Sequence, residues 1–129
     1  MEGVRLFSLQ KGYGREQVAR CKRMFPVTEL ATDRDESNGA FVDTAAVIMN
    51  LDLVVTCDTA IGHLAGGLGA EVWEALSFVP ESRWMLGRAD TPWYPTMRLF
   101  RQVSLGNWPS VFEQMKSALS DRLSKQPTN

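Results

Sequence analysis

Residues 53–69 read LVVTCDTAIGHLAGGLG, and this stretch decides the fold. Its first five residues are almost continuously apolar and partly β-branched, which is typical of a strand buried on both faces in a parallel sheet. Asp58 and Thr59 follow, and small apolar residues then predict a helix over 60–68 that ends at Gly69. A buried strand that leads directly into a helix is the repeating unit of an α/β fold.

The same alternation continues in both directions from this stretch. Further strands are predicted over residues 4–9, 27–31, 71–76 and 97–102. Further helices are predicted over residues 15–25, 45–50 and 110–125. We expect Asp43 or Thr44 to cap the second of these helices, polar residues 32–39 to form a loop, and the tail 126–129 to fray. The pattern predicts βαβ units and a mainly parallel sheet of about five strands, in a single domain over residues 1–125.

The composition limits the possible classes of protein. The chain has 129 residues, which suits one domain, and a formal net charge of −1, which argues against a nucleic-acid-binding protein that depends on a basic surface. Cys21 and Cys57 do not make a disulfide framework, and His63 is the only histidine, so a zinc site is not expected. The sequence contains no apolar run long enough for a membrane span and no signal-peptide pattern at its start. We therefore expect a cytoplasmic protein.

The turn after the strand at 53–57 is the sharper of two candidate sites. Ligands of open α/β sheets bind beyond the carboxyl ends of the strands, and the amides at a helix N-terminus favour an anion. Thr59 offers a hydroxyl, and His63 lies four residues later on the same side of the first helical turn. The alternative is that Asp58 or Thr59 only caps the helix and that His63 is an ordinary, partly buried helix residue.

Two other segments could contribute to a site. Lys11 follows the first predicted strand, and Gly12 lets the backbone approach a phosphate closely, although the loop lacks both the dinucleotide-binding and the P-loop glycine patterns. In the long loop over 78–95, Arg83 and Arg88 could hold a phosphate or carboxylate, and Trp84 could offer a stacking face. The alternatives are a solvated loop around Lys11 and a purely structural flap over 78–95.

Residues 58–69, DTAIGHLAGGLG, resemble the DTxxxHLAxALG segment of the ADP-heptose:lipopolysaccharide heptosyltransferase family. They are more similar still to the glycosyltransferase-like region that follows tetratricopeptide repeats in many bacterial proteins. The flanking stretches that this region shares with the chain are residues 8–12 (SLQKG), 41–46 (FVDTAA) and 92–102 (PWYPTMRLFRQ). The resemblance extends over about residues 4–115, with several separated motifs in the same order.

The resemblance implies the GT-B architecture, in which two Rossmann-like domains face each other across a cleft and the C-terminal domain binds a nucleotide-sugar donor. The chain looks like that C-terminal half, which implies a Rossmann-like three-layer α/β/α fold. It also implies a missing N-terminal domain, which normally supplies the acceptor contacts and commonly the catalytic base. No catalytic residue can be assigned on this basis.

The resemblance also implies roles for residues of the two candidate loops. The residues expected to hold the donor diphosphate through backbone amides are Thr59, Ala60 and Ile61. Lys11 neutralises the diphosphate, Asp58 lies toward the sugar, and His63 lies near the phosphates. Ser8 and Gln10 are expected to line the same strand end, and Gly12 is expected among the residues that bind the diphosphate.

We therefore expect a domain that binds the diphosphate of a nucleotide or nucleotide sugar as a substrate, with no cofactor and no metal. Without a partner domain we do not expect it to transfer a sugar, because half a cleft cannot position an acceptor. The alternative is a non-catalytic interaction module or remnant that keeps the fold without binding a ligand, and whose exposed surface could form homo-oligomers. Glu74 lies on a predicted buried strand, where a carboxylate is costly unless it is paired or at a sheet edge. It indicates relaxed constraint, or an exposed surface against which the missing half would pack.

Overall fold

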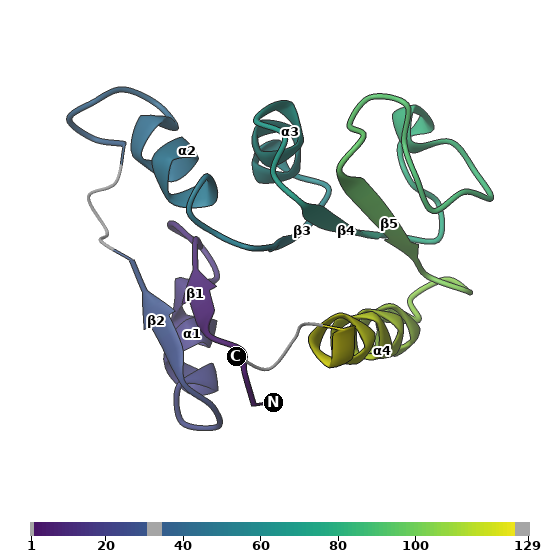
Figure 1. Cartoon of the computed structure of the whole chain (residues 1–129), viewed down its shortest axis with the longest axis horizontal. Coiled ribbons are helices and arrows are strands. Elements are labelled where there is room, and N and C mark those ends of the chain that lie inside the picture. Colours follow the sequence, from purple (N-terminus) through teal and green to yellow (C-terminus); the bar gives the residue numbers. More distant parts are fainter. Residues whose placement is uncertain (1, 31–34, 126–129) are drawn as a thin grey trace. The chain divides into compact units, whose positions relative to one another are not determined.

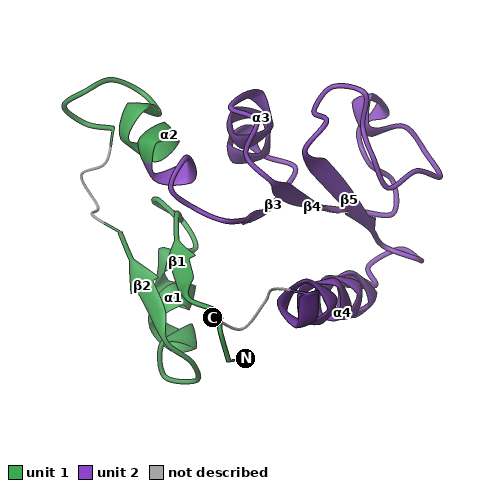
Figure 2. Ribbon diagram, in the orientation of Figure 1, with its two compact units in different colours: residues 1–46 green, residues 47–129 purple. Residues whose placement is uncertain are grey.

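The computed structural model describes residues 2–30 and 35–125 of the chain. These residues form two compact units, residues 1–46 (unit 1) and residues 47–129 (unit 2), which Figure 2 shows in different colours. The helices and strands of both units follow one another along the chain as labelled in Figure 1. The prediction of one domain over 1–125 stays a prediction, and the predicted tail 126–129 lies outside the described residues.

Unit 1 contains one parallel βαβ motif. Strand β1 (Leu6–Ser8) pairs with strand β2 (Val27–Glu29) in parallel, and helix α1 (Arg15–Cys21) connects them. Gly14 starts α1 with a left-handed backbone, at a φ of 88°, which a glycine adopts without strain. The helix is shorter than predicted, because the chain turns after Cys21, where the amides of Met24 and Phe25 both donate to its carbonyl.

Helix α2 (Val42–Ile48) begins three residues before the predicted start and runs across the boundary between the units. The prediction that Asp43 or Thr44 caps it is wrong, since both residues lie inside the helix. The carboxylate of Asp35 takes that role: it accepts the backbone N–H of Thr44 at 3.0 Å and the Thr44 hydroxyl at 2.5 Å. Of the predicted loop over 32–39, residues 32–34 lie outside the described part of the chain.

Unit 2 is built on a three-stranded parallel sheet in the order β3-β4-β5. The strands are β3 (Val54–Cys57), β4 (Val72–Leu76) and β5 (Met97–Arg101). The helices are α3 (Ala60–Gly67), the short 3₁₀ helix η1 (Ser82–Trp84) and α4 (Trp108–Lys125). All five residues of the central strand β4 are buried. The last helix starts two residues before its predicted start, so Pro109 lies in its first turn, where proline is tolerated.

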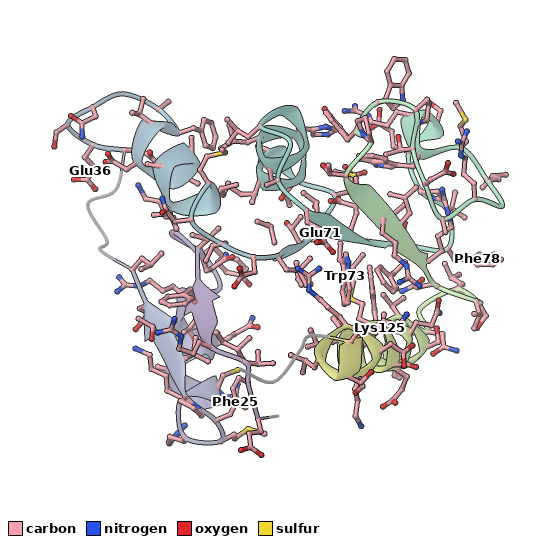
Figure 3. All side chains as sticks on the ribbon, in the orientation of Figure 1. Phe25, Glu36, Glu71, Trp73, Phe78 and Lys125 are labelled. Carbon is pink, nitrogen blue, oxygen red and sulfur yellow. The ribbon has the colours of Figure 1, made fainter. Side chains whose placement is uncertain are left out.

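The two faces of this sheet are covered by different helices. On one face, Trp73 and Phe100 pack with Val111 and Met115 of α4, and Figure 3 shows Trp73 directed toward that helix. Side chains alternate along a strand, so Glu74 points to the opposite face, where it meets the first turns of α3. Unit 2 is therefore an α3–sheet–α4 sandwich, as Figure 1 shows.

All five predicted strands exist, and every strand pairing is parallel, so the α/β class is confirmed. The described strands form two sheets, of two and three strands, where the sequence predicted one sheet of about five. In the parts of the chain that the structure describes, none of the helices is both long and apolar enough to span a membrane.

Close packing of α3 on β4 gives the first testable prediction. A Cβ atom added to Gly62 would lie 2.4 Å from Oε2 of Glu74, whereas a Cβ atom on Gly67 of the same helix meets nothing within 4 Å. We expect Gly62→Ala to destabilise unit 2 by about 1–3 kcal/mol through overpacking. The matched control Gly67→Ala should be neutral or stabilising by up to about 1 kcal/mol.

Urea denaturation followed by tryptophan fluorescence measures this effect, because all four tryptophans lie in unit 2. In a Glu74→Val background the cost of Gly62→Ala should largely disappear, since the clashing carboxyl group is gone. An equal cost in both backgrounds would show that Glu74 does not set the spacing between α3 and β4.

Candidate functional site

The N-terminus of α3 lies at the carboxyl end of β3, as predicted. Thr59 occupies the N-cap position with an extended backbone, but its side chain makes no capping hydrogen bond. Its hydroxyl lies 3.2 Å from the hydroxyl of Thr56 instead. The amides of Ala60 and Ile61 belong to the first turn of α3, so helix geometry gives them no carbonyl partner within the helix. The turn thus offers N–H donors and the positive end of a helix dipole.

His63 is fixed by hydrogen bonds at both ring nitrogens. Nε2 lies 3.0 Å from Nη1 of Arg83, and Nδ1 lies 2.9 Å from the hydroxyl oxygen of Tyr94. A guanidinium can only donate, so Nε2 must accept in this arrangement. The proton therefore sits on Nδ1, which donates to Tyr94. This network joins α3 to two points of the loop between β4 and β5.

Aromatic packing holds the same network in place. The ring of Trp84 stacks on His63, with centroids 5.4 Å apart and planes inclined by 14°. Tyr94 lies so close to α3 that a Cβ atom on Gly66 would fall 2.5 Å from its ring. Trp84 is only 1% exposed, so its ring packs against His63 and does not face solvent.

The charges around His63 are mixed. Arg83 also donates to Glu81 at 2.6 Å, and this hydrogen bond raises the pKa of the guanidinium, which therefore stays charged. The carboxylate of Asp58 lies 3.9 Å from Nε2 of His63. The N-terminal turn of α3 (residues 58–63, the α3 turn) therefore combines the cation of Arg83 and backbone N–H donors with an acceptor, the carboxylate of Asp58. This set suits a ligand that carries both phosphate and hydroxyl groups.

Arg88 lies outside this cluster. Its guanidinium forms a two-pronged pair with Asp90, at 2.7 and 3.0 Å, which lowers the pKa of that carboxylate. The predicted long loop is thus divided: Arg83 and Trp84 contact His63, whereas Arg88 is engaged with its own neighbour.

Glu74 is a buried carboxyl group behind the α3 turn. It is 0% exposed on the central strand, so the expectation of an exposed surface is wrong. Within the described residues neither carboxyl oxygen has a hydrogen-bond partner. Burial, and secondly the charge of Asp58, raise the pKa of Glu74 to about 7. The burial of Glu74 could not be predicted from the sequence, because the order of the strands in the sheet is not known from a local pattern.

The other candidate residues meet in unit 1. Ser8, Gln10, Lys11 and Gly12 line one small cavity of about 40 Å³, together with Arg15, Glu29 and Leu30. Glu29 pairs with Arg15 and with Lys22, and the hydrogen bond from Lys22 is the main cause that lowers its pKa. The side-chain amide of Gln10 donates to the carbonyl of Tyr13 at 2.7 Å and braces the glycine-containing turn.

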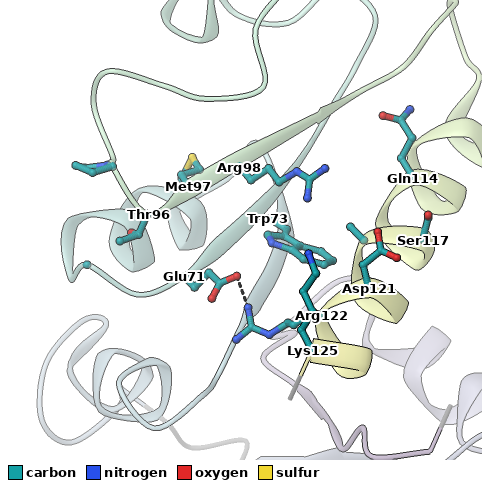
Figure 4. A pocket seen from close by; sticks show the side chains of 13 residues that line it. Glu71, Trp73, Thr96, Met97, Arg98, Gln114, Ser117, Asp121, Arg122 and Lys125 are labelled. Atoms are coloured by element: carbon teal, nitrogen blue, oxygen red, sulfur yellow. Dashed lines mark hydrogen bonds and ion pairs between the residues drawn. The ribbon is translucent and has the colours of Figure 1, made fainter. Parts of the chain in front are cut away.

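A larger groove, of about 970 Å³, lies elsewhere in unit 2, between α4 and the amino ends of β4 and β5 (Figure 4). Arg122 forms an ion pair with Glu71 across one end of it, and Arg98 lies over the ring of Phe100 at 4.6 Å. Ligands of parallel α/β sheets bind at the carboxyl ends of the strands, so we do not assign the predicted anion site to this groove. Among the described residues, no three His, Cys, Asp or Glu side chains gather in a way that could hold a metal ion.

Tyr94, Glu81 and Glu74 belong to the site environment but were not predicted from the sequence. Tyr94 was visible in the PWYP segment at 92–95, but its pairing with His63 joins residues 31 positions apart and leaves no local pattern. Glu81 was visible only as a charge near Arg83.

No family model matches the chain, and no solved structure matches it. The chain is similar to the curated protein "Protein FlbA" of Caulobacter vibrioides, with 29% identity over 120 residues. The match includes 92% of this chain and 20% of FlbA, so the chain spans about a fifth of that relative's length. This similarity does not establish a family or an activity for the chain.

The raised pKa of Glu74 predicts how the stability of unit 2 depends on pH. The folded state binds a proton on Glu74 that the unfolded state releases between pH 4.5 and about 7, so stability should fall as the pH rises through this window. Full ionisation costs about 3 kcal/mol on this basis. In Glu74→Gln the loss of stability caused by ionisation of Glu74 should vanish. The stability of the variant relative to the native chain should therefore increase as the pH rises from 5 to 8.

Urea unfolding of both proteins at several pH values measures the difference. Comparing the two removes the contributions of Glu29, Asp35 and Asp90, whose lowered pKa values act in the opposite direction at more acidic pH. A constant difference between the proteins from pH 5 to pH 8 would show that Glu74 is not titrating in this window.

Proposed function

We propose that unit 2 binds the diphosphate of a nucleotide or nucleotide sugar at the N-terminus of α3. The observation that carries the proposal is the position of Arg83, whose guanidinium is hydrogen-bonded to His63 of α3, four residues after the N-cap Thr59. A cation next to a helix N-terminus that no side chain caps is a suitable setting for a phosphate. The resemblance of residues 58–69 to glycosyltransferase donor-binding segments supports the same ligand class.

The proposal gives each group a role. The amides of Ala60 and Ile61 and the guanidinium of Arg83 contact phosphate oxygens, and Asp58 accepts a hydroxyl group of the sugar. His63, locked by Tyr94, holds Arg83 through Nε2. In a transfer reaction these donors would stabilise the leaving diphosphate, without a cofactor or a metal. The proposal includes no catalytic base and expects transfer only when a second domain supplies the acceptor.

The cavity of unit 1 is a separate candidate for phosphate contacts. Ser8, Gln10, Lys11 and Gly12 come together there, which supports the prediction that they act as one group. The proposal assigns them to the same ligand class, in a cytoplasmic protein, and the titration below examines each loop independently.

The direct test is an NMR titration of the full chain with ADP, UDP, GDP and their sugar conjugates. We expect saturable shifts at the amides of residues 58–63 with one of these ligands, and a loss of affinity of about tenfold or more in Arg83→Gln. Arg98→Gln is the matched control, since it also removes one positive charge. Arg98 lies on the face of the sheet that α4 covers, opposite to α3, so this variant should leave the affinity unchanged.

Shifts that appear at residues 8–14 would show that the unit 1 loop also responds to the ligand. If millimolar concentrations of every ligand leave residues 58–63 unshifted, the diphosphate site is refuted. The alternative function, a protein-interaction module, then takes its place. An observation that favours it is the exposure of apolar side chains at Val103 and Leu105, just after β5, and at Phe112 of α4.

We also infer that the five strands belong to one sheet of a Rossmann-like three-layer α/β/α fold. A two-stranded parallel sheet with strands of three residues is too small to be stable by itself. The strand β3 pairs on one side with β4, and Val55 in its middle is 55% exposed. An apolar, unpaired edge of a parallel sheet calls for another strand. A single sheet of all five strands meets both needs.

Amide hydrogen exchange tests whether the five strands form one sheet. The N–H of Val54 donates to Glu71 on the β4 side at 2.9 Å, and the alternation of the backbone directs the N–H groups of Val55 and Cys57 to the other edge. In one continuous sheet these two amides should be protected as strongly as that of Val54. Rapid exchange at Val55 and Cys57 beside slow exchange at Val54 would contradict the single sheet.

A further inference from the structure

Glu74 stands directly behind the α3 turn, on the side of the helix that faces the sheet. Its carboxyl oxygens approach the first turns of α3, where Gly62 leaves room for them. The side chain is fully buried, and both oxygens lack a hydrogen-bond partner among the described residues. An ionised carboxylate in such a place is costly, so its charge state must respond to any charge that arrives at the other side of the turn.

We propose that binding of an anion at the N-terminus of α3 is coupled to uptake of a proton by Glu74. The inference rests on the proposed function, because it concerns the same site and adds its regulation by pH. The chemistry is a single protonation equilibrium: the carboxylate takes a proton from solvent when the anion binds and releases it when the anion leaves. The neutral acid removes a like charge from the vicinity of the bound anion. The site therefore binds anions more tightly in mildly acidic than in mildly basic solution.

Several other charged or titratable groups lie in the cluster at the N-terminus of α3, and their effects have to be distinguished from that of Glu74. Asp58, which follows β3, carries the charge that, after burial, raises the pKa of Glu74. Nε2 of His63 on α3 lies 3.9 Å from the carboxylate of Asp58. From the loop between β4 and β5 come Arg83 and Glu81, which pair with each other, and Tyr94.

The neighbouring strand β5 contributes Arg101 to the same face of the sheet. Its guanidinium donates to the carbonyls of Arg88 and Trp84, and burial lowers its pKa without removing its charge. The ring of His63 belongs to the same cluster, beside Asp58. The test has to distinguish the carboxyl group from this ring.

Inorganic sulfate is a suitable probe, because it stays doubly charged throughout the neutral range and does not titrate itself. The full chain is titrated near pH 6 and near pH 8, at constant ionic strength, and the amide shifts of residues 60–62 give the affinity. With the resting pKa of Glu74 at about 7, a dianion a few ångströms away moves it by about two pH units, which makes binding about tenfold weaker near pH 8. Glu74→Gln should bind sulfate with nearly the same affinity at both pH values.

Glu113→Gln is the matched control, since it makes the same chemical change on the exposed side of α4 and should keep the full pH dependence. A second measurement needs no variant: in protein with ¹³C-labelled glutamate, the carboxyl signal of Glu74 should titrate near neutral pH, with a midpoint that rises when sulfate is added. This measurement also covers the case in which Glu74→Gln does not fold.

The outcomes separate the two proposals. Binding that weakens with pH in the native chain but not in Glu74→Gln, together with the shifted carboxyl midpoint, supports the coupling. Binding with a pH dependence that survives in Glu74→Gln, or with an unmoved carboxyl midpoint, overturns the coupling and leaves the anion site intact. If sulfate gives no shifts at residues 60–62, the same pH comparison is made with the nucleotide that shifts residues 58–63. The absence of shifts with sulfate and with every nucleotide overturns both the coupling and the anion site.

Discussion

The close packing of α3 on the central strand β4 is the constraint on which the rest of unit 2 depends. Two glycines allow it: Gly62 leaves room for the carboxyl group of Glu74, and Gly66 leaves room for the ring of Tyr94. Because Tyr94 reaches the helix at this point, its hydroxyl can fix Nδ1 of His63, which leaves Nε2 for Arg83. A larger residue at Gly66 would therefore displace both Tyr94 and the orientation of His63. The position of Arg83 near the N-terminus of α3 therefore depends on the lack of a side chain at Gly66.

This packing also explains why the loop between β4 and β5 is ordered around the helix. Trp84 stacks on His63, the backbone carbonyl of Trp84 receives a hydrogen bond from Arg101, and the indole of Trp93 donates to the carbonyl of Arg83. The loop is thus tied to β5 and α3 through side chains and contains only one short turn of helix. Arg83 gains its place from these ties, since its own backbone belongs to no strand.

Much of this fold could be predicted from the sequence, because it is written in local patterns. The run of apolar residues at 53–57 and the small residues after Thr59 place β3 and α3 within a residue or two. The contacts that shape the site could not be predicted in this way. His63 meets Arg83 and Tyr94 only because a sheet and a loop bring distant segments together. The environment of Glu74 depended on strand order, which put its strand between β3 and β5 and away from any sheet edge.

The charges at the α3 turn favour one kind of ligand over another within the proposed class. Arg83 is already paired with Glu81, and Asp58 lies close to His63, so a bare phosphate would meet an acceptor as well as donors. A ligand that carries hydroxyl groups next to its phosphates can satisfy Asp58 as a donor while its phosphate oxygens accept from Arg83 and the α3 amides. A nucleotide sugar has this combination, and inorganic phosphate does not. The buried acid at Glu74 favours the phosphate part of either ligand, because its neutral form removes a negative charge that no ligand hydroxyl can reach.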